Sequence, residues 1–435
     1  MIQGNFSKYE NYKNSGIEWI EEVPEHWEIK RLKEILSEVV YGTSEKTKET
    51  GKYEVLGMGD IDEGKVSFPQ KRFIDDIPNY LLIKRGDLLF NRTNSPALVG
   101  KVGLVEVDTH NVTFASYLIR LRVRNNQHDR YFWYFLNSEL FISYSRSNAI
   151  QTANQANLSS SKLKQFKIIH IPLSLQKAIA DYLDAKTALI DQQIDLLKQK
   201  ANQYSQLKQS LINETVTRGL DKSVPMKDSG VEWIGEVPEH WIIKRHKDIF
   251  TERGSKGYPD EPLLIASQDR GVVLKNSYDR HTMTIQKDFD SQKLVKINDF
   301  VISLRSFEGG IEIAHNRGII SAAYTVFYKS DPSGLGYYKY LFKSKKFISF
   351  LATLTTGIRE GRNINYQQLK RDFIPVPPIF EQVKITNYLN EKINLIEQII
   401  INIDVQITKL VELRKTLIND VITGKIKVTK AAPAE

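Results

Sequence analysis

The chain of 435 residues contains no cysteine, which excludes disulfides, thiolate catalysis and cysteine-ligated zinc or iron–sulfur sites. It also lacks any uninterrupted apolar run near the roughly 20 residues that span a bilayer, and the N-terminus has no charged start followed by an apolar stretch. We therefore expect no membrane association and a cytoplasmic location. The eight histidines show no ligand spacing, so no metal site is predicted.

Recognisable catalytic motifs are missing as well. The stretch "GDIDEGKV" (59–66) has the spacing of a phosphate-binding loop, but Val66 stands where Ser or Thr would hold Mg²⁺, and the neighbouring carboxylates would repel phosphate. We interpret it as a hairpin turn. No glycine-rich turn after a strand predicts a nucleotide cofactor, and no Asn-Pro-Pro or Asp-Pro-Pro run of the adenine-methylating kind occurs. We predict no catalytic residue and no bound cofactor; turnover by the purified chain alone would support the alternative, a self-sufficient enzyme.

The net charge of +9 is confined to two segments. Residues 37–165 hold 17 Lys and Arg against 14 Asp and Glu, residues 251–370 hold 18 against 12, and the remainder is neutral. Such a distribution is typical of two phosphate-binding domains on a neutral scaffold. Charges of this size would also simply keep the two segments soluble.

One unusual segment occurs twice. "SGIEWIEEVPEHWEIKRLKEIL" (15–36) and "SGVEWIGEVPEHWIIKRHKDIF" (229–250) match at 16 of 22 positions, so the chain contains an internal duplication. We call each copy a strap. Large aromatic side chains beside a fixed proline favour a structural anchor over a catalytic site. The predicted anchors are Trp19, Trp27, Trp233 and Trp241.

A second repeat follows each strap. Residues 175–217 and 381–423 contain no glycine or proline, and their apolar residues alternate spacings of four and three, as in a coiled coil. Each should form a helix of roughly 65 Å. Lys208 and Arg414 share the one seam position where the apolar pattern lapses in both copies. The predicted seam is Leu183, Ile190, Ile194, Leu197, Leu211, Leu389, Ile393, Ile396, Ile400, Ile403, Ile407, Leu410 and Leu417.

These repeats predict an α+β protein with two α/β globular domains separated by two long antiparallel helices. A pseudo-two-fold axis relating the halves would match the local two-fold axes of DNA, and the helices would fix the gap between two half-sites. The predicted segments are 1–165 (strap and first domain), 166–220 (first long helix), 221–370 (strap and second domain) and 371–435 (second long helix and tail).

Polar residues at strand ends and turns are the predicted DNA contacts. Arg pairs bidentately with guanine, Asn with adenine, Ser and Thr with either, and Lys mostly meets phosphate. A solvated surface role is the alternative for each residue. The candidates are Arg92, Thr93, Asn94, Ser95 and Lys101 in the first domain, and Arg305, Ser306, Arg317, Arg359, Arg362 and Asn363 in the second.

Several stretches together resemble the DNA-specificity subunit of type I restriction-modification systems, over about residues 13–426. They are the duplicated "VPEHW", "LLFNRTNS" (88–95), "IPLSLQKAIADYLD" (171–184) and "IPVPPIFEQVKITNYL" (374–389), with the long helices behind them. The resemblance implies a non-catalytic subunit whose two target recognition domains each read one half of a bipartite, asymmetric site in double-stranded DNA, with the paired helices setting the spacer.

The resemblance also implies the partners. They are two adenine-N6 methyltransferase subunits, which carry S-adenosylmethionine, and in the full complex two endonuclease/translocase subunits. The remaining alternative is an architectural coiled-coil protein that binds DNA without sequence choice, which equal affinity for all duplexes of one length would indicate.

Overall fold

The computed structural model describes residues 7–96, 98–152, 155–278, 288–356 and 363–428. The chain folds as two compact units, residues 1–196 with 405–435 and residues 197–404. Because each unit takes one half of each long helix, this division cuts across the four segments defined from the sequence. Each unit is described by itself.

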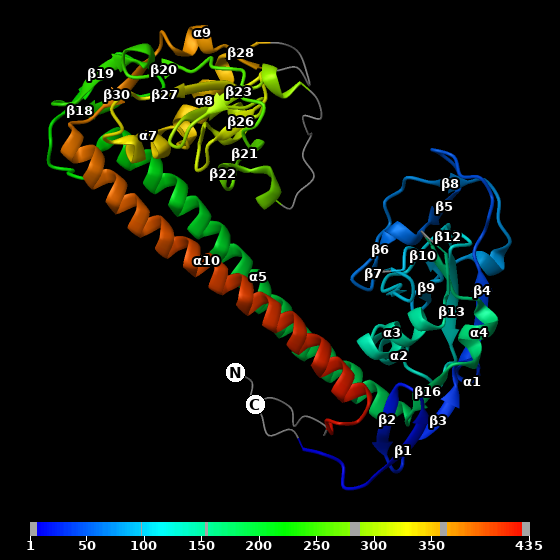
Figure 1. Ribbon diagram of the computed structural model, residues 1–435. Helices are drawn as coiled ribbons and strands as arrows, with labels where there is room; N and C mark the ends of the chain where they lie inside the picture. Colours follow the sequence, from blue (N-terminus) through cyan, green and yellow to red (C-terminus); the bar gives the residue numbers. More distant parts are fainter. Residues whose placement is uncertain (1–6, 97, 153–154, 279–287, 357–362, 429–435) are drawn as a thin grey trace. The chain divides into compact units, whose positions relative to one another are not determined.

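Two long helices, α5 (Leu173–Arg218) and α10 (Ile379–Ile422), are shared by the units (Figure 1). In the first unit the N-terminal half of α5 and the C-terminal half of α10 share one core, with Ile190 and Ile194 beside Leu417. In the second unit Ile212 of α5 shares a core with Leu389 of α10. The helices are therefore antiparallel in both units.

The heptad positions of both helices face inward. Eight of them are less than 9% exposed: Leu183, Ile190, Ile194, Leu389, Ile393, Ile396, Ile403 and Leu417. The other five are half-buried: Leu197, Leu211, Ile400, Ile407 and Leu410. Apolar residues recurring every three and four positions thus bury one stripe of each helix, as the hydrophobic effect requires of an amphipathic helix.

The first unit is built on a six-stranded sheet of order β4-β13-β9-β11-β7-β6. Its strands are β4 (Leu36–Tyr41), β13 (Leu118–Val123), β9 (Leu88–Asn91), β11 (Val102–Leu104), β7 (Lys65–Val66) and β6 (Ile61–Asp62). A second sheet has the order β12 (Val112–Phe114), β5 (Tyr53–Leu56), β8 (Phe73–Ile74). The short helices are α1 (Leu32–Ile35), α2 (Asp129–Leu136), α3 (Glu139–Ser147) and α4 (Ser160–Gln165).

The second unit repeats the centre of this sheet as β20-β27-β24-β25. These strands are β20 (Thr251–Glu252), β27 (Thr325–Tyr328), β24 (Phe300–Ile302) and β25 (Glu312–Ile313). Further strand pairs are β21 (Leu264–Ser267) with β22 (Gly271–Leu274), and β23 (Lys293–Val295) with β26 (Gly318–Ile320). The short helices are α6 (Ser306–Gly309), α7 (Leu335–Leu341), α8 (Lys345–Thr353) and α9 (Tyr366–Leu369).

Single 3₁₀ turns complete both units. They are η1 (Met58–Asp60), η2 (Asn79–Leu81), η3 (His246–Asp248), η4 (Lys275–Ser277) and η5 (Phe289–Ser291).

Each strap takes part in a hairpin. The strand that follows the hairpin pairs with the strand that directly precedes a long helix. The hairpins are β1 (Tyr12–Ile17) with β2 (Ile20–Pro24), and β17 (Met226–Asp228) with β18 (Glu236–Pro238). The following pairs are β3 (Glu28–Arg31) with β16 (Lys167–His170), and β19 (Ile242–Arg245) with β30 (Phe373–Val376).

The strap tryptophans occupy equivalent places in the two units. Trp27 and Trp241 are fully buried, and each lies against the glycine that follows the C-terminus of a long helix. A side chain at Gly424 would collide with Trp27, and Gly219 lies in the same position against Trp241. Both glycines have positive φ, so they end the helices where another residue would be strained.

The other two strap tryptophans pack on aromatic side chains of short helices. Trp19 stacks on Tyr144 of α3, and Trp233 stacks on Phe350 of α8. The strap therefore joins the long helices to the globular part of each unit. Among the described helices, none is both long and apolar enough to cross a membrane.

Candidate nucleic-acid interface

A tight turn before the central strand fixes an aspartate in each unit. In the first unit the carboxylate of Asp87 accepts a hydrogen bond from the Lys84 backbone N–H at 2.9 Å, with Gly86 at a φ of +87°. In the second unit Asp299 accepts from the Lys296 N–H at 2.8 Å, with Asn298 at a φ of +71°. Glycine and asparagine are the residues that tolerate this left-handed conformation, so the turns "KRGD" and "KIND" are equivalent.

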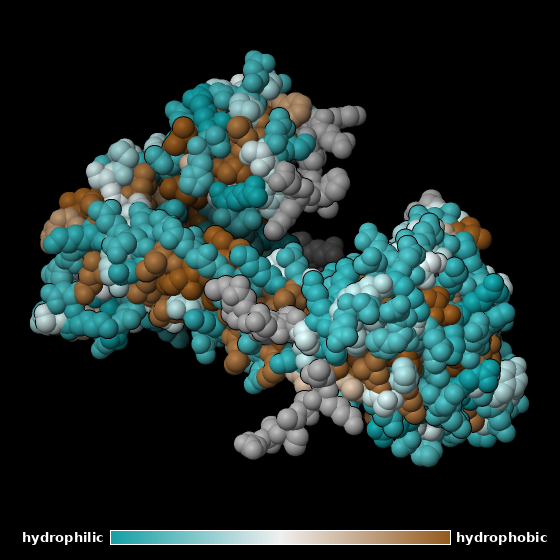
Figure 2. Space-filling view, turned by 90° about the horizontal axis from the view of Figure 1, so that it is seen from below, coloured by the Kyte–Doolittle hydropathy of each residue, from teal (hydrophilic) through white to brown (hydrophobic). Residues whose placement is uncertain are grey.

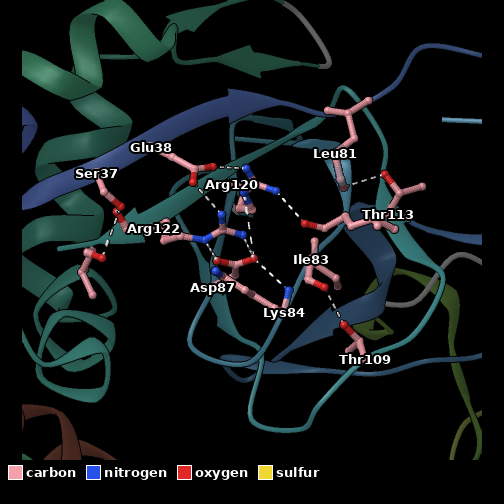
Figure 3. A network of polar contacts seen from close by, with 12 residues as sticks. Ser37, Glu38, Leu81, Ile83, Lys84, Asp87, Thr109, Thr113, Arg120 and Arg122 are labelled. Atoms are coloured by element: carbon pink, nitrogen blue, oxygen red, sulfur yellow. Dashed lines mark hydrogen bonds and ion pairs between the residues drawn. The ribbon is translucent and has the colours of Figure 1, made fainter. Parts of the chain in front are cut away.

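Figure 3 shows the ionic network that surrounds the first of these aspartates. Arg122 donates two hydrogen bonds to Asp87, from Nε at 2.6 Å and Nη2 at 2.8 Å. Arg120 donates to the carbonyl oxygen of Leu82 at 2.7 Å and to Glu38 at 2.5 Å. Burial, together with the positive charge of Arg122, lowers the pKa of Arg120. Both arginines lie on β13 and fasten it to the turn before β9.

The second unit reaches the same result from a different place in the chain. Arg253, the residue that follows β20, donates to Asp299 from Nε at 2.6 Å and from Nη2 at 3.0 Å. Its guanidinium lies 4.2 Å from the ring centroid of Tyr328, the residue of β27 that is 206 positions after Arg122. The buried carboxylate is thus kept in both units, while its arginine partner lies on β13 in the first unit and directly after β20 in the second.

Four of the first-domain candidates, Arg92 to Ser95, directly follow β9, and Lys101 directly precedes β11. Arg92 donates to the Ser116 carbonyl oxygen at 3.2 Å and to the Asn157 side chain at 2.8 Å, and its guanidinium lies 4.9 Å from the Tyr41 ring centroid. Thr93 is 6% exposed, so its side chain does not reach the surface. These contacts give Arg92 and Thr93 structural roles. Asn94, Ser95 and Lys101 are half-buried.

Three short strands gather at this place, in the order β10-β15-β14. They are β10 (Thr93–Asn94), β15 (Ala156–Asn157) and β14 (Ile150–Gln151). The sheet brings two of the predicted residues beside a hairpin that the sequence analysis did not single out. The polar "QTANQAN" stretch (151–157) was the available signal in the sequence.

The second-domain candidates do not form one cluster. Arg305 is exposed and ion-pairs with Glu308, Arg317 ion-pairs with Glu261 at 2.7 Å, and Ser306 is 1% exposed inside α6. Burial of Ser306 argues against a direct base contact. Asn363 is exposed and begins β29 (Asn363–Ile364), which pairs with β28 (Thr355–Thr356). Arg359 and Arg362 lie outside the described residues.

No cluster of metal-ligating side chains is found among the described residues. Within the parts of the chain that the structure describes, no three His, Asp or Glu side chains gather as a metal site would require.

Comparisons with known proteins agree on one family. The family model for the type I restriction modification DNA specificity domain matches residues 24–204. A Methanocaldococcus jannaschii protein described as the MjaX specificity subunit of a type I restriction enzyme is 28% identical over 447 residues, covering 97% of this chain and 98% of that protein. The MjaVIII specificity subunit of the same organism is 25% identical over 219 residues, covering 48% and 49%.

Solved structures share the fold. A chain from work on complex assembly and conformational transition of the type I restriction-modification system superimposes with a TM-score of 0.67 at 17% identity, covering 93% of this chain and 99% of that chain. The crystal structure of the HsdS subunit from Thermoanaerobacter tengcongensis gives a TM-score of 0.52 at 18% identity, with coverage of 93% and 98%. Each of these matches covers 93% of this chain, so it includes residues of both units. The chain thus resembles the DNA-specificity subunits of type I restriction-modification systems over nearly its whole length, and residues 24–204 match the family model of their DNA specificity domain.

Proposed function

We propose that this chain reads a bipartite DNA sequence and holds the other subunits of a type I restriction-modification complex over it. The observation that carries the proposal is the duplication: two units keep the same straps, central sheet and aspartate turn, while the surface residues of their globular parts differ. Two units with the same backbone framework and different surface residues are expected of a protein that reads two different half-sites.

Phosphate contacts would orient each globular part and base contacts would select the site. The excess of Lys and Arg in residues 37–165 and 251–370 supplies the charge for the first role. Affinity should then fall as salt rises, with a slope of about 0.9 in log–log form for each phosphate contacted.

The proposed partners are two adenine-N6 methyltransferase subunits and two endonuclease/translocase subunits. Apolar side chains on the outer faces of the long helices favour docking there. Figure 2 shows such side chains reaching the surface among hydrophilic ones. On the helices they include Leu189, Leu196, Leu207, Leu395, Ile401 and Val405, each more than 45% exposed.

The chemistry would belong to those partners. S-adenosylmethionine is the cofactor of the methyltransferase subunit, and this chain would act without catalysis or a bound cofactor. Methylation requires the target adenine to leave the base stack, so the chain would help to bend or open the duplex. A protein that acts on chromosomal DNA would be located in the cytoplasm, and this is the proposed location of the chain.

The test is a map of methylated adenines in a methylation-free bacterial host that expresses this chain with the methyltransferase subunit encoded beside it. We expect one bipartite motif, methylated once in each half and on opposite strands. An assembled complex that leaves DNA unmethylated in the presence of S-adenosylmethionine, or that binds all duplexes of one length equally, would contradict the proposal. Methylation by the purified chain alone would contradict the non-catalytic role.

A further inference from the structure

The hairpin β14–β15 of the first unit is firmly held on one side only. Its turn is closed by Thr152, whose backbone N–H and hydroxyl donate to the Gln155 carbonyl oxygen at 2.7 and 3.0 Å. The inner strand is anchored, since Ala156 and the following Leu158 are buried and Asn157 accepts a hydrogen bond from Arg92.

The outer strand presents an unusual surface. Ile150 is 75% exposed, the largest value for a bulky apolar side chain among the described residues. Gln151 and Gln155 are exposed, and neither side-chain amide has a hydrogen-bond partner within the described residues. The unpaired edge of β14, with its exposed Ile150, contributes nothing to the core. Such an edge promotes aggregation unless a partner covers it.

The surroundings of the hairpin favour a polyanion as that partner. No Asp or Glu occurs between Glu139 and Asp181, while this stretch contains five Lys and Arg residues. Arg146 in α3 and Lys162 in α4 flank the hairpin. Lys162 donates to the Asn148 carbonyl oxygen at 2.7 Å, which places a cation close to the hairpin without neutralising it.

The second unit has the same hairpin with other side chains. Helix α8 follows α3 by 206 residues, and the pair Thr356–Asn363 follows the pair Ile150–Asn157 by the same offset. The strand pair therefore recurs in both units, while residues at matching positions differ, as Ile150 and Thr356 do. An element whose backbone recurs in both units while its side chains differ is expected to determine which DNA sequence each unit prefers.

We propose that the β14–β15 hairpin is the base-reading element of the first unit, and that Gln151, Gln155 and Ile150 select A·T pairs in the major groove. A two-stranded ribbon fits that groove. A Gln amide pairs bidentately with N6 and N7 of adenine, and an apolar side chain contacts the thymine methyl. This inference rests on the proposed function, because it names the part of the chain that performs the recognition.

The test uses the complex with the methyltransferase subunit and the methylated motif of the unchanged chain. The double variant Gln151→Ala/Gln155→Ala should relax the preference for one or more A·T pairs in a single half of the motif, by about 5- to 150-fold. The other half and the spacing should stay as they were. Asn363→Ala on the matching hairpin should instead affect the opposite half, and Asn79→Ala, which removes an exposed amide elsewhere in the first unit, should affect neither.

Ile150 has a separate readout. Replacing thymine by deoxyuridine at the contacted position removes one methyl group and should weaken binding of the unchanged complex about fourfold. The Ile150→Ala complex should not distinguish the two duplexes. All three side chains are exposed, so unchanged thermal unfolding of the variants should accompany these results.

Two outcomes would overturn the inference while leaving the proposed function intact. One is an unchanged motif from an assembled double variant. The other is an equal loss of affinity for every sequence together with a smaller salt slope, which is the behaviour of a phosphate contact. If the unchanged complex has no bipartite motif at all, the proposed function fails first and the hairpin assignment falls with it.

Discussion

Nε of Arg414 lies 3.1 Å from a carboxylate oxygen of Asp191, across the helix pair of the first unit. In the second unit Lys208 and Glu397 form the equivalent ion pair at 2.5 Å, each partner 206 residues from its counterpart. Arg414 and Lys208 stand at the seam position where both heptad patterns lapse. A charged residue at one seam position costs stability but specifies the register of the helices.

Replacing both seam cations by leucine should therefore separate stability from register. We expect Lys208→Leu/Arg414→Leu to unfold at the same or a higher temperature, because Asp191 and Glu397 are about half exposed and stay hydrated. The same variant should form mixed oligomers, which light scattering after gel filtration would detect. The control is Lys200→Leu/Lys409→Leu, which removes two exposed lysines away from the seam. A single species with a lowered unfolding temperature would show that the ion pairs stabilise and do not specify.

The buried carboxylate of Asp87 should be among the most sensitive positions of the first unit. Asp87→Ala removes the buried anion shared by Arg122 and the buried Arg120 and leaves them the half-buried Glu38, so we expect a loss of about 3–5 kcal/mol in the free energy of unfolding. Denaturant unfolding would measure it. Asp75→Ala is the matched control, because its ion pair with Lys48 is exposed and screened by water and should contribute little to stability.

The repeats explain how much of this fold could be predicted. Heptad periodicity predicted both long helices and the seam, because residue spacing specifies them, and the internal duplication with a pseudo-two-fold axis predicted their antiparallel pairing. The strap anchors were visible because the strap sequence is nearly identical in the two copies. These features depend on local pattern and not on which distant residues meet.

The parts that escaped prediction depend on tertiary contacts between unlike residues. Arg122 on β13 and Arg253 directly after β20 bind equivalent aspartates from different places in the chain, so no common spacing reveals them. Arg92 looked like a base contact because it ends a strand beside a turn, whereas its guanidinium is engaged by Ser116 and Asn157. The hairpin at Ile150 contains two-residue strands, which are too short to produce a readable alternation.

His246 is predicted to destabilise the second unit. It is fully buried among Phe250, Phe327 and other rings, and neither ring nitrogen has a hydrogen-bond partner in the described structure. The first repeat has the equally buried Leu32 at this position. We expect His246→Leu to raise the free energy of unfolding by about 1–3 kcal/mol at pH 7.5, because an unsatisfied polar group leaves the core. Urea denaturation would measure the change.

The pH dependence of this effect has a definite sign. Burial lowers the pKa of His246 to about 3, whereas an unfolded histidine titrates near 6.5. Between these values the unfolded chain binds a proton that the folded chain does not, so His246 costs increasing stability as pH falls from 6.5 towards 3. The advantage of His246→Leu should therefore be larger at pH 5 than at pH 7.5. The reciprocal Leu32→His should show the opposite change, and a pH-independent difference in both variants would contradict the assignment.

Lengthening both helices should lengthen the preferred gap between half-sites. A seven-residue insertion after Lys200 and another after Asp404 would fall opposite each other, judging from the pairing of Asp191 with Arg414 and Lys208 with Glu397. Each adds about 10 Å of helix and keeps the seam continuous. DNA rises 3.4 Å per base pair, so the methylated motif should gain about three base pairs of spacer while both half-sites keep their sequences. Four-residue insertions at the same places lengthen the helices less and shift the seam, so that complex should methylate more weakly. An unchanged spacer from an assembled seven-residue variant would mean that DNA bending, and not helix length, sets the gap.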